Sequence, residues 1–154
     1  MAGRFDAAIT MHVQMNIRDK PIWFAEIANL MAPGARLALW EVCTASADLQ
    51  PQWPTPWSID GTDSFLITPD ELLVAVTSAG LSALDWQDDT AWAVQWAATA
   101  DSDRNTLGEL TLPSLLDDGT TRVLNLRSAI SDGTVRVVRG LFAKPTDAPE
   151  GTSS

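Results

Sequence analysis

The chain has 154 residues, of which 45% are hydrophobic, and a formal net charge of −10 at pH 7. This length predicts one domain with enough chain to bury a core. The negative charge disfavours nucleic acid and anionic membrane surfaces as partners, since both repel an acidic protein. The sequence has no apolar run of the ~18 residues that a membrane helix needs, and its first residues lack the apolar core of a signal peptide.

Histidine and cysteine are scarce, which limits the chemistry of the chain. His12 and Cys43 are the only residues of their types. A single cysteine cannot form an internal disulfide, and this favours a cytoplasmic location. One histidine and one cysteine cannot supply a zinc shell, and no stretch has calcium-loop spacing, so we expect no metal site.

The nine glycines are spread widely along the chain. No two of them lie closer together than seven residues. This spacing excludes both the G-x-G-x-x-G pattern and the phosphate-binding loop of nucleotide-binding proteins.

The first part of the chain is predicted to form a strand, a helix and a second strand. Phe5–Met11 is a short apolar strand, and a connector of residues 12–20 follows it. The helix Pro21–Met31 has proline in its first turn, where the missing amide costs nothing. After a turn at Pro33-Gly34, Arg36–Val42 is the second strand. Strand, helix, strand is the unit that builds parallel sheets.

Two further features of this region are informative. Apolar residues recur at helical spacing and predict one buried stripe, made of Trp23, Ile27, Leu30 and Met31.

The segment Cys43–Ile67, which contains three prolines, is too long to be a simple connector. Segments of this size tend to be lids or binding loops, and we expect this one to select the substrate.

The second half contains clearer boundaries. Thr68-Pro69-Asp70-Glu71 is a capping box that opens a helix, with Leu72, Leu73 and Val76 facing the core and Gly80 closing it. The pairs Asp88-Asp89 and Asp117-Asp118 are interpreted as helix-start and turn residues. The remaining predicted elements are a strand Leu81–Gln87 with Leu84 and Trp86 on one side, a helix opened by Asp88-Asp89-Thr90, a weaker helical segment Leu110–Leu116, a helix Thr120–Ser131, a tight turn at Asp132-Gly133 and a strand Thr134–Ala143.

About four strands and several helices therefore predict an α/β protein. The strand Phe5–Met11 is apolar and would normally be central in such a sheet. With no earlier strand beside it, one border of the sheet carries unpaired amides and carbonyls. This combination predicts a truncated chain, or one completed by a partner or by self-association through the open border.

Several motifs together resemble one known family, the class I S-adenosylmethionine-dependent methyltransferases. Phe5–Ile17 and Leu30–Val42, with the turn P-G-x-R-L, look like the fourth and fifth strand region of that family. The rest resembles the branch of sarcosine and dimethylglycine methyltransferases in Ser64-Phe65-Leu66, Thr68–Glu71, Ala79-Gly80-Leu81, Asp85–Thr90 and Ala143-Lys144-Pro145.

This resemblance implies the fold and the cofactor. The fold is then a partial Rossmann-like sheet, the last strands of the family's seven-stranded sheet, with helices on both faces. Residues 1–145 would be the C-terminal portion of a methyltransferase domain, and residues 146–154 a disordered tail. The family's glycine-rich turn, which cradles S-adenosylmethionine, is not found in this chain, so the resemblance implies the cofactor while leaving the chain's own binding in question.

The expected site lies at the carboxyl ends of the first two strands, where open α/β sheets bind ligands. Its residues are Met11, His12 and Val13 for the cofactor, His12 also as the catalytic residue, and Asn16, Trp40, Glu41 and Trp57 for a small-molecule methyl acceptor. His12 titrates near neutral pH and could orient or deprotonate the attacking amine or hydroxyl. Alignment alone can also suffice for methyl transfer, with His12 merely packing beside the cofactor.

The tryptophans and Glu41 each have two possible interpretations. The chain has seven tryptophans and no tyrosine, and the face of an aromatic ring suits a methylated ammonium or a sulfonium. Strand-end and loop positions favour Trp40 and Trp57 for the pocket, whereas periodic positions favour the core for Trp23, Trp86, Trp92 and Trp96. Glu41 is either an anchor for a cationic substrate or a solvated carboxylate at a strand end.

Two function classes follow. The chain is the substrate-side half of a methyltransferase acting on a small molecule, or it is a non-catalytic remnant or interaction subunit that a partner completes.

Overall fold

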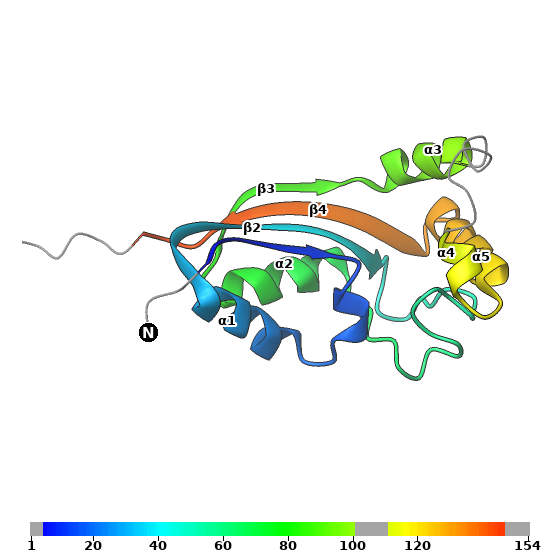
Figure 1. Cartoon of the computed structure of the whole chain (residues 1–154), viewed down its shortest axis with the longest axis horizontal. Helices are drawn as coiled ribbons and strands as arrows, with labels where there is room; N and C mark the ends of the chain where they lie inside the picture. The colour runs from blue at the N-terminus through cyan, green and yellow to red at the C-terminus, as the bar shows by residue number, and fades with distance from the viewer. Residues whose placement is uncertain (1–4, 101–110, 147–154) are drawn as a thin grey trace, which may run out of the picture.

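A computed structural model describes residues 5–100 and 111–146 of the chain. Within these residues, four strands form one sheet with helices around it (Figure 1). The elements in chain order are β1 Phe5–Met11, a 3-10 turn η1 Gln14–Asn16, α1 Lys20–Leu30, β2 Met31–Thr44, α2 Pro69–Ser78, β3 Ser82–Asp88, α3 Thr90–Ala100, α4 Leu112–Leu115, α5 Gly119–Ser131 and β4 Val135–Ala143.

The strand order in the sheet is β1-β2-β4-β3. β1 and β2 are parallel and are connected by α1. β4 is antiparallel to both β2 and β3. The predicted number of strands and the parallel first unit are confirmed. β1 lies at a border of this sheet, and none of the described residues pairs with its outer side.

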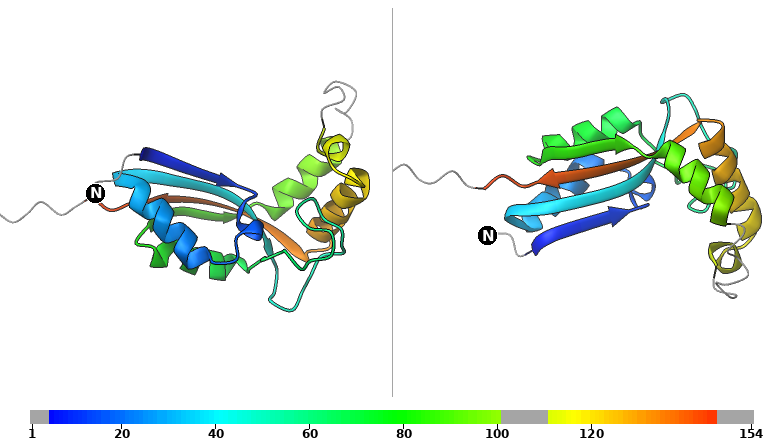
Figure 2. Two further views of the ribbon diagram at one scale, coloured as in Figure 1. Left: turned by 60° about the horizontal axis from the view of Figure 1, so that its bottom comes forward. Right: turned by 90° about the horizontal axis from the view of Figure 1, so that it is seen from above.

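The first core lies between one face of the sheet and the helices α1 and α2, which run along it (Figure 2). Its largest fully buried side chains include Phe24 of α1, Leu37 of β2, Leu72 of α2 and Phe142 of β4. Cys43 of β2 is also fully buried here. Burying apolar side chains of this size stabilises the fold by about 1.5–3 kcal/mol each.

The buried stripe of α1 differs from the prediction. Phe24 and Ala28 are buried, and Lys20 precedes them by one turn, so the stripe runs at i, i+4 spacing from the first residue of the helix. Leu30, predicted to be buried, is 43% exposed. Trp23 and Ile27 of the predicted stripe are half-buried against this core, and Met31 is buried but belongs to β2. Asp19 caps the helix one residue earlier than expected, accepting a hydrogen bond from the amide of Ile22.

The predicted turn at Pro33-Gly34 is instead an irregularity inside a long strand. β2 begins at Met31, and its pairing with β1 shifts register between Phe5 and Ala7. Gly34 has φ of 80°, which is the left-handed region that glycine occupies without strain. Its amide donates to the carbonyl of Lys144, so β2 stays attached to the end of β4 across the irregularity.

A second core covers one end of the opposite face. There α3 and α5 pack beside the carboxyl end of β2 and the start of β4, around Met15, Val42, Ala93, Ala129, Val135 and Val137. The sheet therefore has helices on both faces, but at different ends. Over the rest of this second face, Ile9 is 71% exposed, Met11 52% and Leu141 37%.

The later elements match the predictions closely, with small shifts. α5 begins at Gly119 and β4 at Val135, one residue from the predicted bounds, and Gly133 makes the turn with φ of 82°. Leu84 is half exposed, because β3 shifts register between Ala83 and Asp85. The predicted helix around Leu110–Leu116 is one turn, α4. Leu110 and, of the predicted tail 146–154, residues 147–154 lie outside the described residues. No helix in the described part is long and apolar enough to cross a membrane.

The capping box of α2 is confirmed. The amide of Glu71 donates to Thr68 Oγ1, and the amide of Thr68 donates to Glu71 Oε2 at 2.8 Å. Hydrogen bonds to the carboxylate lower the pKa of Glu71, as expected for a charged cap.

We predict that Thr68→Ala lowers the free energy of unfolding by about 1 kcal/mol, since it removes the oxygen that caps α2. Thr68→Ser is the matched control because it keeps this oxygen, and it should stay near the parent. Urea denaturation of the three proteins checks the prediction; equal losses in both variants would assign the effect to the methyl group instead.

Candidate functional site

The chain turns sharply where β1 ends. His12 has φ of 53°, the left-handed region, and its amide donates to the carbonyl of Trp40 at 3.0 Å. The imidazole lies 5.2 Å from the indole of Trp40, ring centre to ring centre. The carboxyl ends of the two parallel strands thus meet here, as the sequence predicted.

Glu41 fixes the residues that follow this turn. Its carboxylate Oε2 accepts hydrogen bonds from the amide of Val13 at 2.8 Å and from the amide of Gln14 at 3.2 Å. The side chain is fully buried, so the alternative of a solvated strand-end carboxylate is wrong. Burial raises the pKa of Glu41, and the two amides oppose this by stabilising the charged form.

The buried position also bears on the expected contact between Glu41 and substrate. With no exposed surface, this carboxyl holds the backbone of residues 13 and 14 and has no face toward solvent. Its second oxygen, Oε1, and the neighbouring buried oxygens Thr10 Oγ1 and Gln14 Oε1 make no hydrogen bond with another group in the described residues. In the described residues, the contacts of the Glu41 carboxylate are therefore with the loop of residues 13 and 14.

Lys20 joins this loop to the long segment after β2. Its Nζ donates to the carbonyl of Ile17 at 2.6 Å and to the carbonyl of Phe65 at 2.5 Å. The amide of Phe65 in turn donates to the carbonyl of Met15 at 2.8 Å. Gln14 adds a side-chain hydrogen bond to the carbonyl of Val42. The segment predicted to select the substrate is therefore attached to the predicted cofactor loop.

Four aromatic side chains form a continuous row from this loop onto α3. Trp40 lies between His12 and Trp92, whose ring is 5.4 Å away, and Trp92 stacks with Trp96 at 6.3 Å. The prediction that Trp92 and Trp96 belong to the core is wrong, since they are 50% and 55% exposed. Helical spacing placed them on one face, but Ala93 occupies the buried position of α3.

The row borders a cavity of about 600 Å³ on the uncovered face of the sheet. Its apolar wall contains Ile9, Met11, Trp40, Trp92 and Leu141, and its polar wall contains Asp85, Asp89 and Arg139. Sequence reasoning missed Trp92 as a residue of this region. The signal that could have found it is its place in the first turn of a helix that starts directly after a strand.

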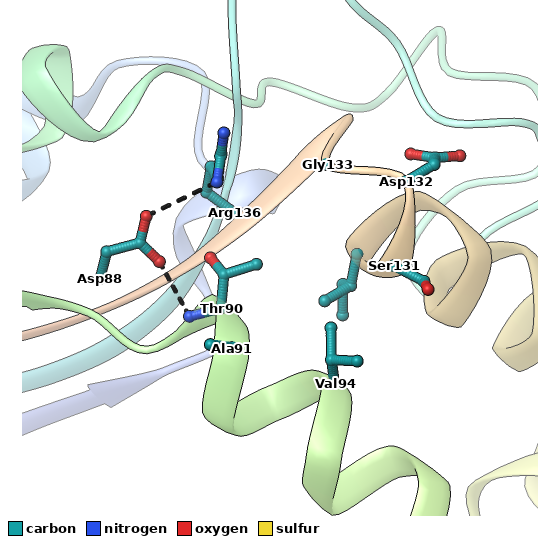
Figure 3. Close-up of a pocket in the computed structure, with 9 residues that line it drawn as sticks. Asp88, Thr90, Ala91, Val94, Ser131, Asp132, Gly133 and Arg136 are labelled. Carbon is teal, nitrogen blue, oxygen red and sulfur yellow. Dashed lines mark hydrogen bonds and ion pairs between the residues drawn. The ribbon is translucent and has the colours of Figure 1, made fainter.

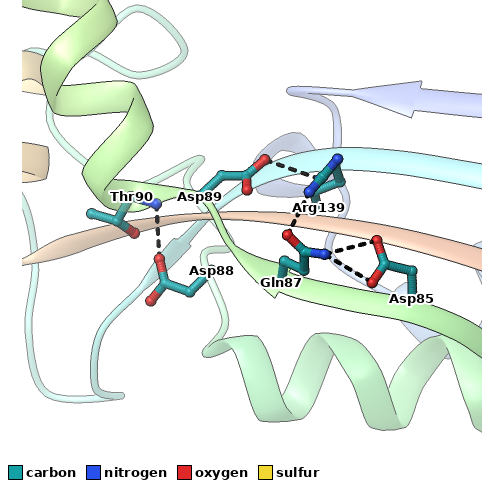
Figure 4. A network of polar contacts seen from close by, with 6 residues as sticks. All are labelled: Asp85, Gln87, Asp88, Asp89, Thr90 and Arg139. Carbon is teal, nitrogen blue, oxygen red and sulfur yellow. Dashed lines mark hydrogen bonds and ion pairs between the residues drawn. The ribbon is translucent and has the colours of Figure 1, made fainter.

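A polar network closes the side of this cavity formed by β3 (Figure 4). Arg139 Nε pairs with Asp89 at 3.2 Å, and Arg139 donates to Gln87 Oε1 at 2.5 Å. Gln87 donates in turn to the carboxylate of Asp85. Asp88 accepts from the amide of Thr90 at 2.8 Å, which confirms the predicted helix-start role of this acidic pair.

A smaller cavity of about 380 Å³ lies between the start of α3, the end of α5 and β4 (Figure 3). Asp88 and Arg136, which line this cavity, form an ion pair at 3.8 Å, and both side chains are about half exposed. Exposed pairs of this length contribute little to stability. None of the residues predicted for the site lines this cavity.

The remaining predicted residues have different surroundings. Asn16 is exposed at the end of η1, and Val13 and Met11 are exposed beside His12. Trp57 packs against the second core, lies edge-to-face with Trp53 at 6.4 Å, and donates from Nε1 to Ser64 Oγ at 3.0 Å. It lines neither of the two cavities. In the described ranges, no group of three histidine, cysteine or acidic side chains could hold a metal ion.

Comparison with solved structures identifies the fold. The chain superposes on the [4+2]-cyclase SpnF with a TM-score of 0.63 at 20% identity, covering 94% of this chain and 52% of that one. A candidate sarcosine dimethylglycine methyltransferase from Galdieria sulphuraria gives a TM-score of 0.65 at 13% identity, covering 94% of this chain and 54% of that one. An O-methyltransferase of a Brevibacillus brevis polyketide synthase, solved with S-adenosyl-L-homocysteine, gives a TM-score of 0.66 at 13% identity, covering 94% of this chain and 46% of that one.

The chain has the methyltransferase fold. The expected resemblance is thereby confirmed at the level of the fold, and the chain spans about half the length of these solved structures. No protein-family model and no curated protein matches the sequence. The presence of a cyclase among the similar structures is a reminder that a shared fold does not fix the reaction.

We predict that Glu41→Leu lowers the free energy of unfolding by at least about 2 kcal/mol, because the part-buried amide of Val13 and the buried amide of Gln14 lose their acceptor. Glu41→Gln keeps an acceptor oxygen and should change it by less than about 1 kcal/mol. Because the folded-state pKa of Glu41 is raised, the parent loses stability relative to Glu41→Gln as pH rises above the unfolded-state value.

The measurement is urea denaturation between acid and neutral pH, with hydrogen exchange at the amides of Val13 and Gln14. Faster exchange at both amides in Glu41→Leu only is the expected pattern. Unchanged exchange in that variant would show that Glu41 does not hold the loop.

A second prediction concerns Lys20, whose pKa burial lowers to about 8 in the folded protein. Above that pH the folded chain binds fewer protons at this site than the unfolded chain does, so the stability contributed by Lys20 rises with pH up to its ordinary pKa of 10.5. We expect the stability of the parent relative to Lys20→Met to increase from pH 8 toward about pH 10. Chemical denaturation across this range is the measurement, and a difference that stays flat would contradict the shift.

Proposed function

We propose that this chain supplies the substrate-side half of an S-adenosylmethionine-dependent methyl transfer to a small molecule. The methyltransferase fold supports the proposal. The observation that carries it is the loop of residues 11–16, which Glu41 holds at the carboxyl ends of two parallel strands beside Trp40. Ligands of open α/β sheets bind at such ends.

In this proposal Met11, His12 and Val13 contact the cofactor. All three side chains are exposed at the end of β1, and Met11 and Val13 offer apolar surface beside the imidazole. These features fit the apolar, methyl-bearing end of S-adenosylmethionine. When bound, this cofactor supplies the activated methyl group.

His12 has a defined protonation state for its proposed role. Partial loss of hydration lowers the pKa of His12 below its ordinary value of 6.5, so the neutral imidazole predominates at pH 7. A neutral imidazole can accept a proton from an amine or hydroxyl, or orient that group toward the methyl carbon. Alignment contributes in either case, because the loop that bears His12 is fixed at Val13 and Gln14.

The methyl acceptor would lie between Asn16 and Trp40, with Trp92 extending the aromatic wall. Trp57 contributes by supporting the long loop through Trp53 and Ser64. Glu41 is a positioning residue, since its carboxyl is buried behind the loop.

A second candidate is a non-catalytic subunit completed by another polypeptide. It is favoured by the outer side of β1, which none of the described strands pairs, and by the uncovered apolar part of the sheet. The two candidates differ in one property: only the first requires contact between the loop and the cofactor.

We predict that S-adenosylhomocysteine shifts the NMR signals of the His12 imidazole and the Trp40 indole at millimolar concentration. Contact with one end of the ligand should give only about 4 kcal/mol of binding free energy. His12 is the only histidine, so its signal is unambiguous. Adenosine is the matched ligand control, since it lacks the part proposed to meet this loop.

His12→Gln should weaken the shift at Trp40 without altering the fold. Equal shifts with adenosine, or shifts confined to other regions, would contradict the proposed cofactor contact and favour the non-catalytic candidate.

A further inference from the structure

Phe65, near the end of the long segment after β2, is held by three groups of the region that follows β1. Its amide donates to the carbonyl of Met15 at 2.8 Å, and its carbonyl accepts from Lys20 Nζ at 2.5 Å. The guanidinium of Arg18 lies over its ring, 4.3 Å from the ring centre. Met15 and Lys20 are each only 3% exposed, so the interior of the fold sets their positions.

These contacts enclose Asn16, which is proposed to meet the methyl acceptor. The preceding carbonyl, that of Met15, accepts from the amide of Phe65. The following carbonyl, that of Ile17, accepts from Lys20 Nζ at 2.6 Å. Hydrogen bonds from a charged donor are roughly twice as strong as those between neutral groups. Phe65 and Lys20 therefore fix the backbone on either side of Asn16, whose side chain is exposed.

The contacts continue from Phe65 into the long segment. The neighbouring Ser64 accepts from Trp57 Nε1 through its Oγ at 3.0 Å, and its amide donates to the carbonyl of Gly61 at 3.1 Å. Gly61 has φ of 88°, and a Cβ there would lie 2.6 Å from the ring of Trp53, so this turn favours glycine. Residues 53–65 thus form one packed unit.

The other end of this packed unit is attached to α5. The carbonyl of Pro54 accepts from Asn125 Nδ2 at 2.9 Å, and the carbonyl of Thr55 accepts from Arg122 at 3.4 Å. Neither contact involves the loop after β1. Phe65 therefore attaches the unit to that loop, whereas Asn125 attaches it to α5.

We propose that Phe65 is a positioning residue that couples the two ligand regions of the proposed methyl transfer. The cofactor would lie against residues 11–13 and the acceptor beside Asn16 and the long segment, so the identity of the two ligands rests on the proposed function. A ligand that holds the loop also holds Asn16 and, through Phe65, the packed unit around Trp57. Because such coupling is reciprocal, occupation of either region tightens binding at the other by the same factor.

Hydrogen exchange without any ligand tests the coupling by itself. Phe65→Leu keeps an apolar side chain but removes the ring that Arg18 covers, a contact worth about two- to fivefold in an equilibrium constant. We therefore expect the amides of Asn16 and Ser64 to exchange about threefold faster in this variant. Phe65→Tyr keeps the ring face and should retain the rates of the parent.

Two further variants make this test decisive. Arg18→Gln removes the same contact from an exposed residue, so it should give the same acceleration without disturbing the core. Asn125→Ala is the matched control, because it frees the end of the unit at α5: Ser64 should exchange faster and Asn16 at the parent rate. Unchanged exchange of Asn16 in both Phe65→Leu and Arg18→Gln, or equal acceleration of Asn16 in Asn125→Ala, would overturn the coupling.

Titration with S-adenosylhomocysteine separates this inference from the proposed function. The indole signal of Trp57, identified by its loss in Trp57→Phe, should shift in the parent and markedly less in Phe65→Leu, while the His12 signal shifts in both. A shift of His12 with none at Trp57, or equal Trp57 shifts in the two proteins, would overturn the coupling and leave the proposed function standing. An unshifted His12 would count against the proposed function, and the exchange rates measured without ligand would still decide the coupling.

Discussion

The arrangement of the candidate site depends on one buried carboxyl. Glu41 reaches from β2 to the first two amides after the turn at His12, and without it those amides would have no acceptor in the interior. A carboxyl of this kind is costly to bury, and two amide hydrogen bonds offset that cost. His12 precedes these two amides directly and contacts Trp40, and Lys20 attaches the long segment to the same loop.

The helices cover the two faces of the sheet to different extents. α1 and α2 cover most of one face and form a continuous apolar core with it. On the other face, α3 and α5 cover only the end of the sheet where β2 finishes, so the apolar surface near β1 meets solvent. The candidate site lies where the covered and uncovered parts of this second face adjoin, at the end of β1.

Local signals allowed much of the fold to be predicted. The capping box at Thr68, the turn at Gly133 and the unit of strand, helix and strand appear where the sequence placed them, because each depends on residues close in the chain. Burial was harder. Leu30 was predicted to be buried in place of Phe24, because the apolar residues of this helix fit more than one stripe at helical spacing, and the buried one contains Phe24 and Ala28. Trp92 was assigned to the core because helical spacing indicates a shared face but not what that face meets. Glu41 could be placed at the site by position, while its partners depend on a loop 27 or 28 residues away in sequence.

The lone thiol of the chain, that of Cys43, lies inside the first core, near the carboxyl end of β2. Burial raises the pKa of Cys43, so it is neither accessible nor ionised while the fold is closed. Alkylating reagents and oxidants can reach it only when β2 separates from the helices below. The rate at which the Cys43 thiol is modified therefore reports the rate at which this core opens.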